Sequence, residues 1–161
     1  MQLRYITCSG ANENTNIKEL INLANTSNLV EIGIIANSST MKKGKPQYEW
    51  FEQLLNTKEA INMNLALHIN GDWCTDLCAG KIAPELKELL DLKNQTTGTP
   101  VINRWQLNIS NSMNLTKTDG IKSVIKDNPE KEFIFSFNKG PIVMMFVKQL
   151  YDAGLPFSLL Y

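Results

Sequence analysis

The amino-acid sequence predicts an α/β fold built on a parallel sheet, and three observations support this fold class. Strand-length apolar runs alternate with helical patterns along the 161 residues. Most of these runs are nearly continuously apolar, which is typical of strands buried on both faces of a parallel sheet. The runs begin at residues 3, 30, 64, 104, 132 and 157, a mean interval of about 31 residues, which matches the length of one unit of a (β/α)8 barrel.

Six strands are expected from these runs. They are LRYITC (3–8), VEIGIIA (30–36), NLALHIN (64–70), RWQLNIS (104–110), EFIFSFN (132–138) and FSLLY (157–161).

Five helices are expected between the strands, from their start and stop signals. Asn16 begins the first helix, with Glu19 three residues later as its capping-box partner. Pro84 and Pro141 each suit a first helical position, and Gly154 suits a C-terminal cap. The two remaining helices are YEWFEQLL (48–55) and DGIKSVIKDNP (119–129). Each helix supplies the crossover that consecutive parallel strands need.

Two architectures fit this order of elements within a single domain that spans residues 1–161. The first is a TIM-type (β/α)8 barrel that is incomplete, with (βα)5 plus a sixth strand, and the second is an open, doubly wound sheet. Nucleotide-binding open sheets carry G-x-G-x-x-G or G-x-x-x-x-G-K-[ST], and the sequence contains neither motif. We therefore predict the incomplete barrel.

Polar residues two positions apart end three of the expected strands. The pairs are His68 and Asn70, Gln106 and Asn108, and Ser136 and Asn138, and Cys8 ends the first strand. Residues i and i+2 of a strand point to the same face, so these side chains would ring the C-terminal mouth of a barrel, where functional residues gather. The alternative is that strands simply end where the chain meets water.

Charge and composition exclude several classes of protein. Sixteen basic residues balance sixteen acidic ones, so neither nucleic acid nor an anionic membrane is an expected partner. The longest uncharged apolar run, residues 141–147, is shorter than the about 20 residues that span a bilayer. Three cysteines without framework spacing predict reduced thiols and a cytoplasmic protein. His68 is the single histidine, and Cys74 and Cys78 lack further ligands at zinc spacing, so no metal site is expected.

Three features have roles that the sequence leaves open. Glu31 lies within the second strand, either as a site residue or as half of a structural ion pair, because a buried carboxylate is costly unless paired. The loop 36–48 carries Lys42, Lys43 and Lys45, and is either a lid that meets an anionic substrate or a solvated loop. Lys139 would serve a Schiff-base lyase only if it were buried, and its place beside a helix start disfavours that role.

The sequence resembles the phosphoribosylanthranilate isomerases in several short segments. Cys8 and Gly10 are similar to the family's K-I-C-G start, IGIIANSS (32–39) to its second strand and following loop, and ALHING (66–71) to its Q-L-H-G third strand. The match is closer to a bacterial branch labelled isomerase-like. Its similar segments here are SGANENTN (9–16), VEIGII (30–35), ALHINGDWCTDLCAG (66–80), RWQLNI (104–109) and LPFSLLY (155–161).

The resemblance implies a (β/α)8 barrel that performs an Amadori aldose–ketose isomerisation in tryptophan biosynthesis, without metal or organic cofactor. Cys8 occupies the place of the family's general base. The strand-end residues His68, Asn70, Gln106, Asn108 and Asn138 would contact a small phosphorylated substrate.

The sequence also departs from the family. In the similar branch the general acid is an Asp directly after the sixth strand, and this sequence ends at Tyr161. We therefore expect a fragment, or a chain that a partner completes, with little isomerase activity of its own. Its open edge strands would invite self-association. Gln47 stands where the family commonly has an arginine in the lid. The rival hypothesis is a non-catalytic open α/β domain that binds a ligand or a protein.

Overall fold

The computed structural model of the chain describes residues 6–26, 29–57, 65–94, 97–110, 117–137 and 141–160. Its strands are β1 (Ile6–Ala11), β2 (Leu29–Ala36), β3 (Leu65–Ile69), β4 (Ile102–Ile109), β5 (Glu132–Phe137) and β6 (Ser158–Leu160). Its helices are α1 (Ile17–Thr26), α2 (Pro46–Leu55), α3 (Gly71–Cys78), α4 (Pro84–Leu90), α5 (Asp119–Asp127) and α6 (Pro141–Asp152).

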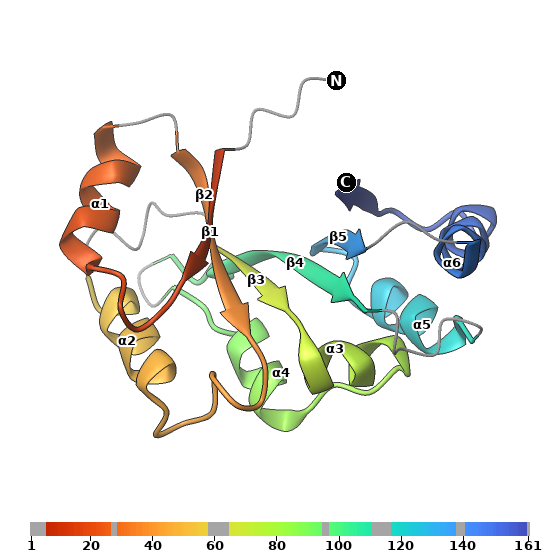
Figure 1. Cartoon of the computed structure of the whole chain (residues 1–161), viewed down its shortest axis with the longest axis horizontal. Helices are drawn as coiled ribbons and strands as arrows, with labels where there is room; N and C mark the ends of the chain where they lie inside the picture. The colour runs from red at the N-terminus through yellow and green to blue at the C-terminus, as the bar shows by residue number, and fades with distance from the viewer. Residues whose placement is uncertain are drawn as a thin grey trace.

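The six strands form one parallel sheet in the order β1-β2-β3-β4-β5-β6. Each crossover therefore moves the chain by one strand in the same direction. Because such crossovers are right-handed, the helices gather on one side of the sheet, in an arc from α1 to α6 (Figure 1). A doubly wound sheet reverses its strand order and carries helices on both faces. The observed order is compatible with part of a (β/α) barrel, and the α/β class with parallel strands is confirmed.

Local signals set the helix boundaries where the sequence predicts them. The side-chain oxygen of Asn16 accepts hydrogen bonds from the backbone N–H groups of Lys18 (2.9 Å) and Glu19 (3.2 Å), so Asn16 is the N-cap of α1. Helices α2, α4 and α6 begin at prolines. Gly154 has φ +70° after the end of α6, the left-handed conformation of a C-terminal cap.

Two expectations about the elements need correction. The first strand continues to Ala11, so Cys8 lies within β1 and does not end it. The β3–β4 crossover contains a helix, α3, in addition to the expected α4. Trp73 and Leu77, like Cys74 and Cys78, are four residues apart, so the sequence of α3 does carry the periodicity of one helix face. Its burial against β4 is what stabilises it.

The hydrophobic core lies between the sheet and the helices. Alternate residues of the strands face the helices and are buried, and they include Ile32, Ile34, Leu65, Leu67, Trp105, Leu107, Phe133 and Phe135. Edge-to-face ring contacts join Trp105 to Phe133 at a centroid distance of 5.1 Å, and Phe135 to Phe146 of α6 at 5.6 Å. The helices leave the opposite face of the sheet uncovered (Figure 1). A functional site would therefore lie on that opposite face.

No helix in the described part of the chain has the length and apolar character needed to cross a membrane.

Candidate functional site

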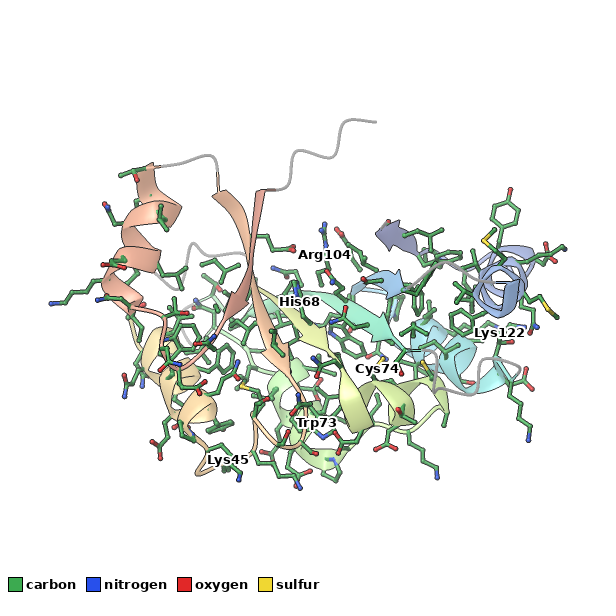
Figure 2. The ribbon with its side chains drawn as sticks, viewed as in Figure 1. Lys45, His68, Trp73, Cys74, Arg104 and Lys122 are labelled. Atoms are coloured by element: carbon green, nitrogen blue, oxygen red, sulfur yellow. The ribbon has the colours of Figure 1, made fainter. Side chains whose placement is uncertain are left out.

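The face of the sheet opposite the helices is largely polar, and we call it the polar face. It carries Glu31, Gly33 and Ile35 of β2, Ala66 and His68 of β3, Arg104, Gln106 and Asn108 of β4, and Glu132, Ile134 and Ser136 of β5. The strand register brings these residues side by side, with His68 level with Gln106 and Asn108 level with Ser136. Figure 2 shows His68 and Arg104 close together beside β3 and β4, while Trp73 and Cys74 belong to the helix layer.

The polar pair of β4 lies together on the polar face, as the sequence predicts. The side-chain amide of Gln106 donates a hydrogen bond to Oδ1 of Asn108 at 3.1 Å. Ser136 lies beside Asn108 on the next strand, and its own predicted partner, Asn138, is outside the described residues. The two amides and the hydroxyl together offer neutral hydrogen-bonding groups near the carboxyl ends of β4 and β5.

Asn70 follows β3 and is joined to Asn37, which follows β2. The amide Nδ2 of Asn37 donates to Oδ1 of Asn70 at 2.7 Å. Oδ1 of Asn37 accepts from the backbone N–H groups of Ser39 (3.0 Å) and Thr40 (3.1 Å), which closes the loop as an Asx turn. Sequence reasoning missed Asn37, although an Asn-Ser-Ser-Thr run directly after a strand is the signal for such a turn.

The same loop is held against the start of α3 by Asp72. Its Oδ1 accepts the backbone N–H of Ser38 at 3.2 Å. Hydrogen bonds from Ser38 lower the pKa of Asp72, so this carboxylate is ionised at neutral pH. Residues 37, 38, 70 and 72 thus form a fixed border at the carboxyl edge of β2 and β3.

His68 lies in β3, two residues before Asn70, with its ring over Gly33. It is 5% exposed, and Nε2 has no hydrogen-bond partner among the described residues. A Cβ atom at position 33 would lie 2.4 Å from both Cε1 and Nε2 of the ring, so the glycine is what makes room for the imidazole. Burial lowers the pKa of His68, which keeps the ring neutral at pH 7.

We expect Gly33→Ala to displace the His68 ring and to lower the free energy of unfolding by about 2 kcal/mol, because the added methyl group overpacks this position. Urea unfolding would measure the loss, and NMR titration would show the pKa of His68 returning towards its ordinary value. In a His68→Ala background the same change should cost much less. Equal costs in both backgrounds would contradict the proposed contact.

Arg104 occupies the other end of the polar face, towards the amino ends of the strands. Its guanidinium lies 2.8 Å from the Glu132 carboxylate and 3.4 Å from the Glu31 carboxylate. Arg104 and Glu31 are buried, whereas the Glu132 side chain is 66% exposed. Of the two roles that the sequence left open for Glu31, the structure shows the ion pair.

Cys8 lies in β1, and its side chain is outside the described part of the chain. In the backbone register Cys8 is paired with Ile32, whose side chain is in the core on the helix side. The β1–β2 register shifts between Cys8 and Ala11.

The loop after β2 does not present Gln47 as a substrate contact. Gln47 is buried, and its side-chain amide donates to the backbone carbonyls of Ile35 (2.8 Å) and Ala11 (3.3 Å). These two hydrogen bonds of Gln47 therefore connect the start of α2 to the ends of β1 and β2. Lys42 and Lys45 are exposed, and Lys43 forms an exposed ion pair with Glu88 at 3.3 Å.

Cys74 and Cys78 are buried on the core side of α3, as expected for packing residues. The hydrogen bond with Cys78, followed by burial, raises the pKa of the Cys74 thiol. Within the described ranges, no group of three or more His, Cys, Asp or Glu side chains is arranged to hold a metal ion.

Comparisons of this chain with protein-family models, with curated proteins and with solved structures found no match.

Proposed function

We propose that the polar face binds a small sugar phosphate, in a barrel-type domain that resembles the phosphoribosylanthranilate isomerases. One observation carries this proposal. A singly wound parallel sheet presents neutral amides, a hydroxyl and an uncharged imidazole together at the carboxyl ends of its strands, which is where barrel enzymes bind their substrates.

The chemistry of these groups suits a polyhydroxylated ligand. Asn70, Gln106 and Asn108 can both donate to and accept from sugar hydroxyls. His68 adds a neutral imidazole whose buried Nε2 has no partner in the described part of the chain. Such a ligand would replace the internal bond from Gln106 to Asn108 with bonds to its own hydroxyl groups.

In the isomerisation that we propose, an acid protonates the ring oxygen of the aminoaldose, and the C1–O bond breaks to leave an iminium ion. Cys8, as a thiolate, then removes the proton from C2, and the electron pair of that C–H bond neutralises the iminium to give an enol. The enol tautomerises to the aminoketose. No oxidant or reductant is consumed.

The described carboxylates of the polar face are poorly placed to be the acid. Glu31 and Glu132 lie towards the amino ends of the strands and are paired with Arg104. Asp72, at the carboxyl edge, is held ionised by Ser38. We therefore expect binding by these 161 residues, with little turnover.

Titration calorimetry with ribose 5-phosphate tests the binding. Gln106→Ala should weaken it about tenfold, the worth of one or two hydrogen bonds. Gln53→Ala, at an exposed position on α2, is the matched control and should leave affinity unchanged. The absence of saturable binding would overturn the proposal. Turnover of phosphoribosylanthranilate that is lost on Cys8→Ala would contradict the low activity that we expect.

The second candidate is a non-catalytic ligand-binding domain, and it is favoured because the described carboxylates of the polar face are paired with Arg104 or held ionised by Ser38. Alkylation by iodoacetamide, followed by peptide mass mapping, separates the two functions. If Cys8 is the base, ribose 5-phosphate should slow its alkylation, while the buried Cys74 and Cys78 serve as unreactive internal controls. Binding without protection of Cys8 would favour the non-catalytic domain.

A further inference from the structure

An Asn-Gly pair lies at the carboxyl edge of the polar face, where β3 passes into α3. Asn70 follows β3, and Gly71 is the first residue of α3. Asparagine before glycine is the dipeptide most prone to deamidation, because the absent side chain lets the backbone nitrogen of glycine approach the asparagine amide carbon. Gly71 is exposed and has φ +58°, a conformation that favours glycine. The turn into α3 therefore requires the residue that makes Asn70 reactive.

The attacking atom in such a reaction, the backbone nitrogen of Gly71, is not engaged by the fold. The first N–H groups of a helix have no acceptor within the helix. Asn70 is the N-cap of α3, but its side chain makes no capping bond, and no other described residue accepts from the Gly71 N–H. By contrast, the N–H groups of Asn70 and Cys74 donate to the carbonyls of Ala36 (3.1 Å) and Asn70 (3.4 Å). The nitrogen of Gly71 is thus available as a nucleophile.

The carbonyl group under attack is polarised by Asn37. The amide Nδ2 of Asn37 donates to Oδ1 of Asn70 at 2.7 Å. A donor on this oxygen stabilises the negative charge that develops there when a nucleophile adds to Cγ. In the described part of the chain, the leaving group, Nδ2 of Asn70, has no hydrogen-bond partner to hold it. Both ends of the Asn70 amide therefore favour substitution at Cγ.

Asn37 itself has the opposite environment, although it shares this hydrogen bond. The residue after it is Ser38, whose backbone N–H donates to Oδ1 of Asp72 at 3.2 Å. Oδ1 of Asn37 is held by the N–H groups of its own Asx turn. The nucleophile and the side chain are both occupied, so Asn37 serves as an internal control for Asn70.

We propose that Asn70 deamidates spontaneously through a cyclic imide formed with Gly71. The nitrogen of Gly71 attacks Cγ of Asn70, a C–N bond forms, and the Cγ–Nδ2 bond breaks. The proton of the Gly71 N–H leaves with the amide nitrogen as ammonia. A water molecule then opens the imide, giving aspartate if the bond to Cγ is hydrolysed and isoaspartate if the main-chain carbonyl is hydrolysed.

The aspartate product fits the surrounding structure. Aspartate is as good an N-cap as asparagine, and a negative charge is favourable at a helix N-terminus. Nδ2 of Asn37 would donate a stronger, charge-assisted hydrogen bond to the new carboxylate. Isoaspartate instead adds a main-chain methylene between β3 and α3, which would disturb the backbone bonds that join position 70 to Ala36 and Cys74. The fold therefore accommodates aspartate and is disturbed by isoaspartate.

The modification would change the charge of the proposed binding site, a consequence that rests on the proposed function. Position 70 lies two residues before Asp72, which is already ionised. A second carboxylate at this edge would repel an anionic ligand. Deamidation should thus weaken the binding of a sugar phosphate while the chain remains folded.

Peptide mass mapping of the aged chain tests the modification. The folded chain is kept at mildly alkaline pH and physiological temperature, beside a sample unfolded in guanidinium chloride, until the unfolded sample has lost most of its Asn70 amide. Digestion in isotopically labelled water marks any deamidation that occurs during digestion. The folded chain should also lose most of the amide at position 70 and keep that of Asn37. A folded chain that retains the Asn70 amide, or that loses the Asn37 amide equally, would overturn the proposal.

Two variants at position 70 complete the test. Asn70→Gln keeps an amide but would need a larger ring to react, so it should show no conversion, and conversion at the same rate would overturn the imide route. Asn70→Asp reproduces the product. It should unfold at the same urea concentration as the wild type, and a lower midpoint would show that the product does not fit. It should bind ribose 5-phosphate about tenfold more weakly, and equal affinities would overturn the effect on the site. Absence of binding by both chains would overturn the proposed function, while the mass map decides the modification independently.

Discussion

Replacing Arg104 with methionine is expected to lower the free energy of unfolding by about 3 kcal/mol at neutral pH, because the change leaves the buried Glu31 carboxylate without its partner. Arg104 and Glu31 are both buried, and their side chains lie 3.4 Å apart. Glu132 is mostly exposed and can be solvated, so its lost contact contributes little to this cost. Urea unfolding would measure the difference.

The cost of Arg104→Met should depend on pH in a defined direction. Burial raises the pKa of Glu31 above its ordinary value, and the charge of Arg104 opposes that shift. A carboxyl group with a raised folded-state pKa binds protons better in the folded state, so stability falls as the pH rises above the ordinary glutamate pKa. Without Arg104 the folded-state pKa of Glu31 rises further. The loss in the variant should therefore be small near pH 4, the ordinary range of a glutamate, and grow towards neutral pH.

The double variant Glu31→Leu/Arg104→Met is the control for this prediction. Apolar side chains in place of a buried ion pair are often neutral or stabilising. The double variant should thus recover most of the lost stability and lose the pH dependence. Similar losses in the single and double variants at every pH would show that Arg104 stabilises the fold by packing and not by pairing with Glu31.

Replacing Gly120 with alanine is expected to destabilise the fold by about 3 kcal/mol, although glycine-to-alanine changes within helices normally stabilise by up to about 1 kcal/mol. Gly120 lies in the first turn of α5 and faces the end of α3. An added Cβ would lie 2.3 Å from the backbone carbon of Ala79 and 2.4 Å from the nitrogen of Gly80. Backbone atoms cannot rotate away as a side chain can, so the two helices would have to separate.

Gly44→Ala is the matched control for Gly120→Ala. Gly44 has φ +86° and open space where a Cβ would be placed. Alanine there should lower the free energy of unfolding by about 1–2 kcal/mol, the cost of holding a non-glycine residue in the left-handed conformation. Thermal or urea unfolding of both variants would separate steric from conformational costs. A Gly120→Ala variant as stable as the wild type would show that α3 and α5 do not approach closely in solution.

Much of the fold follows from local patterns in the sequence. The apolar runs mark all six strands to within a few residues. Asn16, Pro84, Pro141 and Gly154 mark helix ends, because caps and prolines act on the residues next to them. The shared face of Gln106 and Asn108 follows from the alternation of side chains along one strand. Helix α3 was not predicted, although Trp73, Cys74, Leu77 and Cys78 repeat with the spacing of one helix face.

The sequence by itself determined the α/β class, the parallel strands and the polar character of the strand ends, because each of these depends on residues close together in the chain. Only the tertiary structure decided the consecutive strand order, the placement of His68 over Gly33, the pairing of Arg104 with Glu31 and Glu132, and the position of Cys8 opposite Ile32. These features depend on which strands become neighbours and in what register. Register is set by the joint packing of the whole sheet, and a single irregularity, such as the one between Cys8 and Ala11, changes which face a residue occupies.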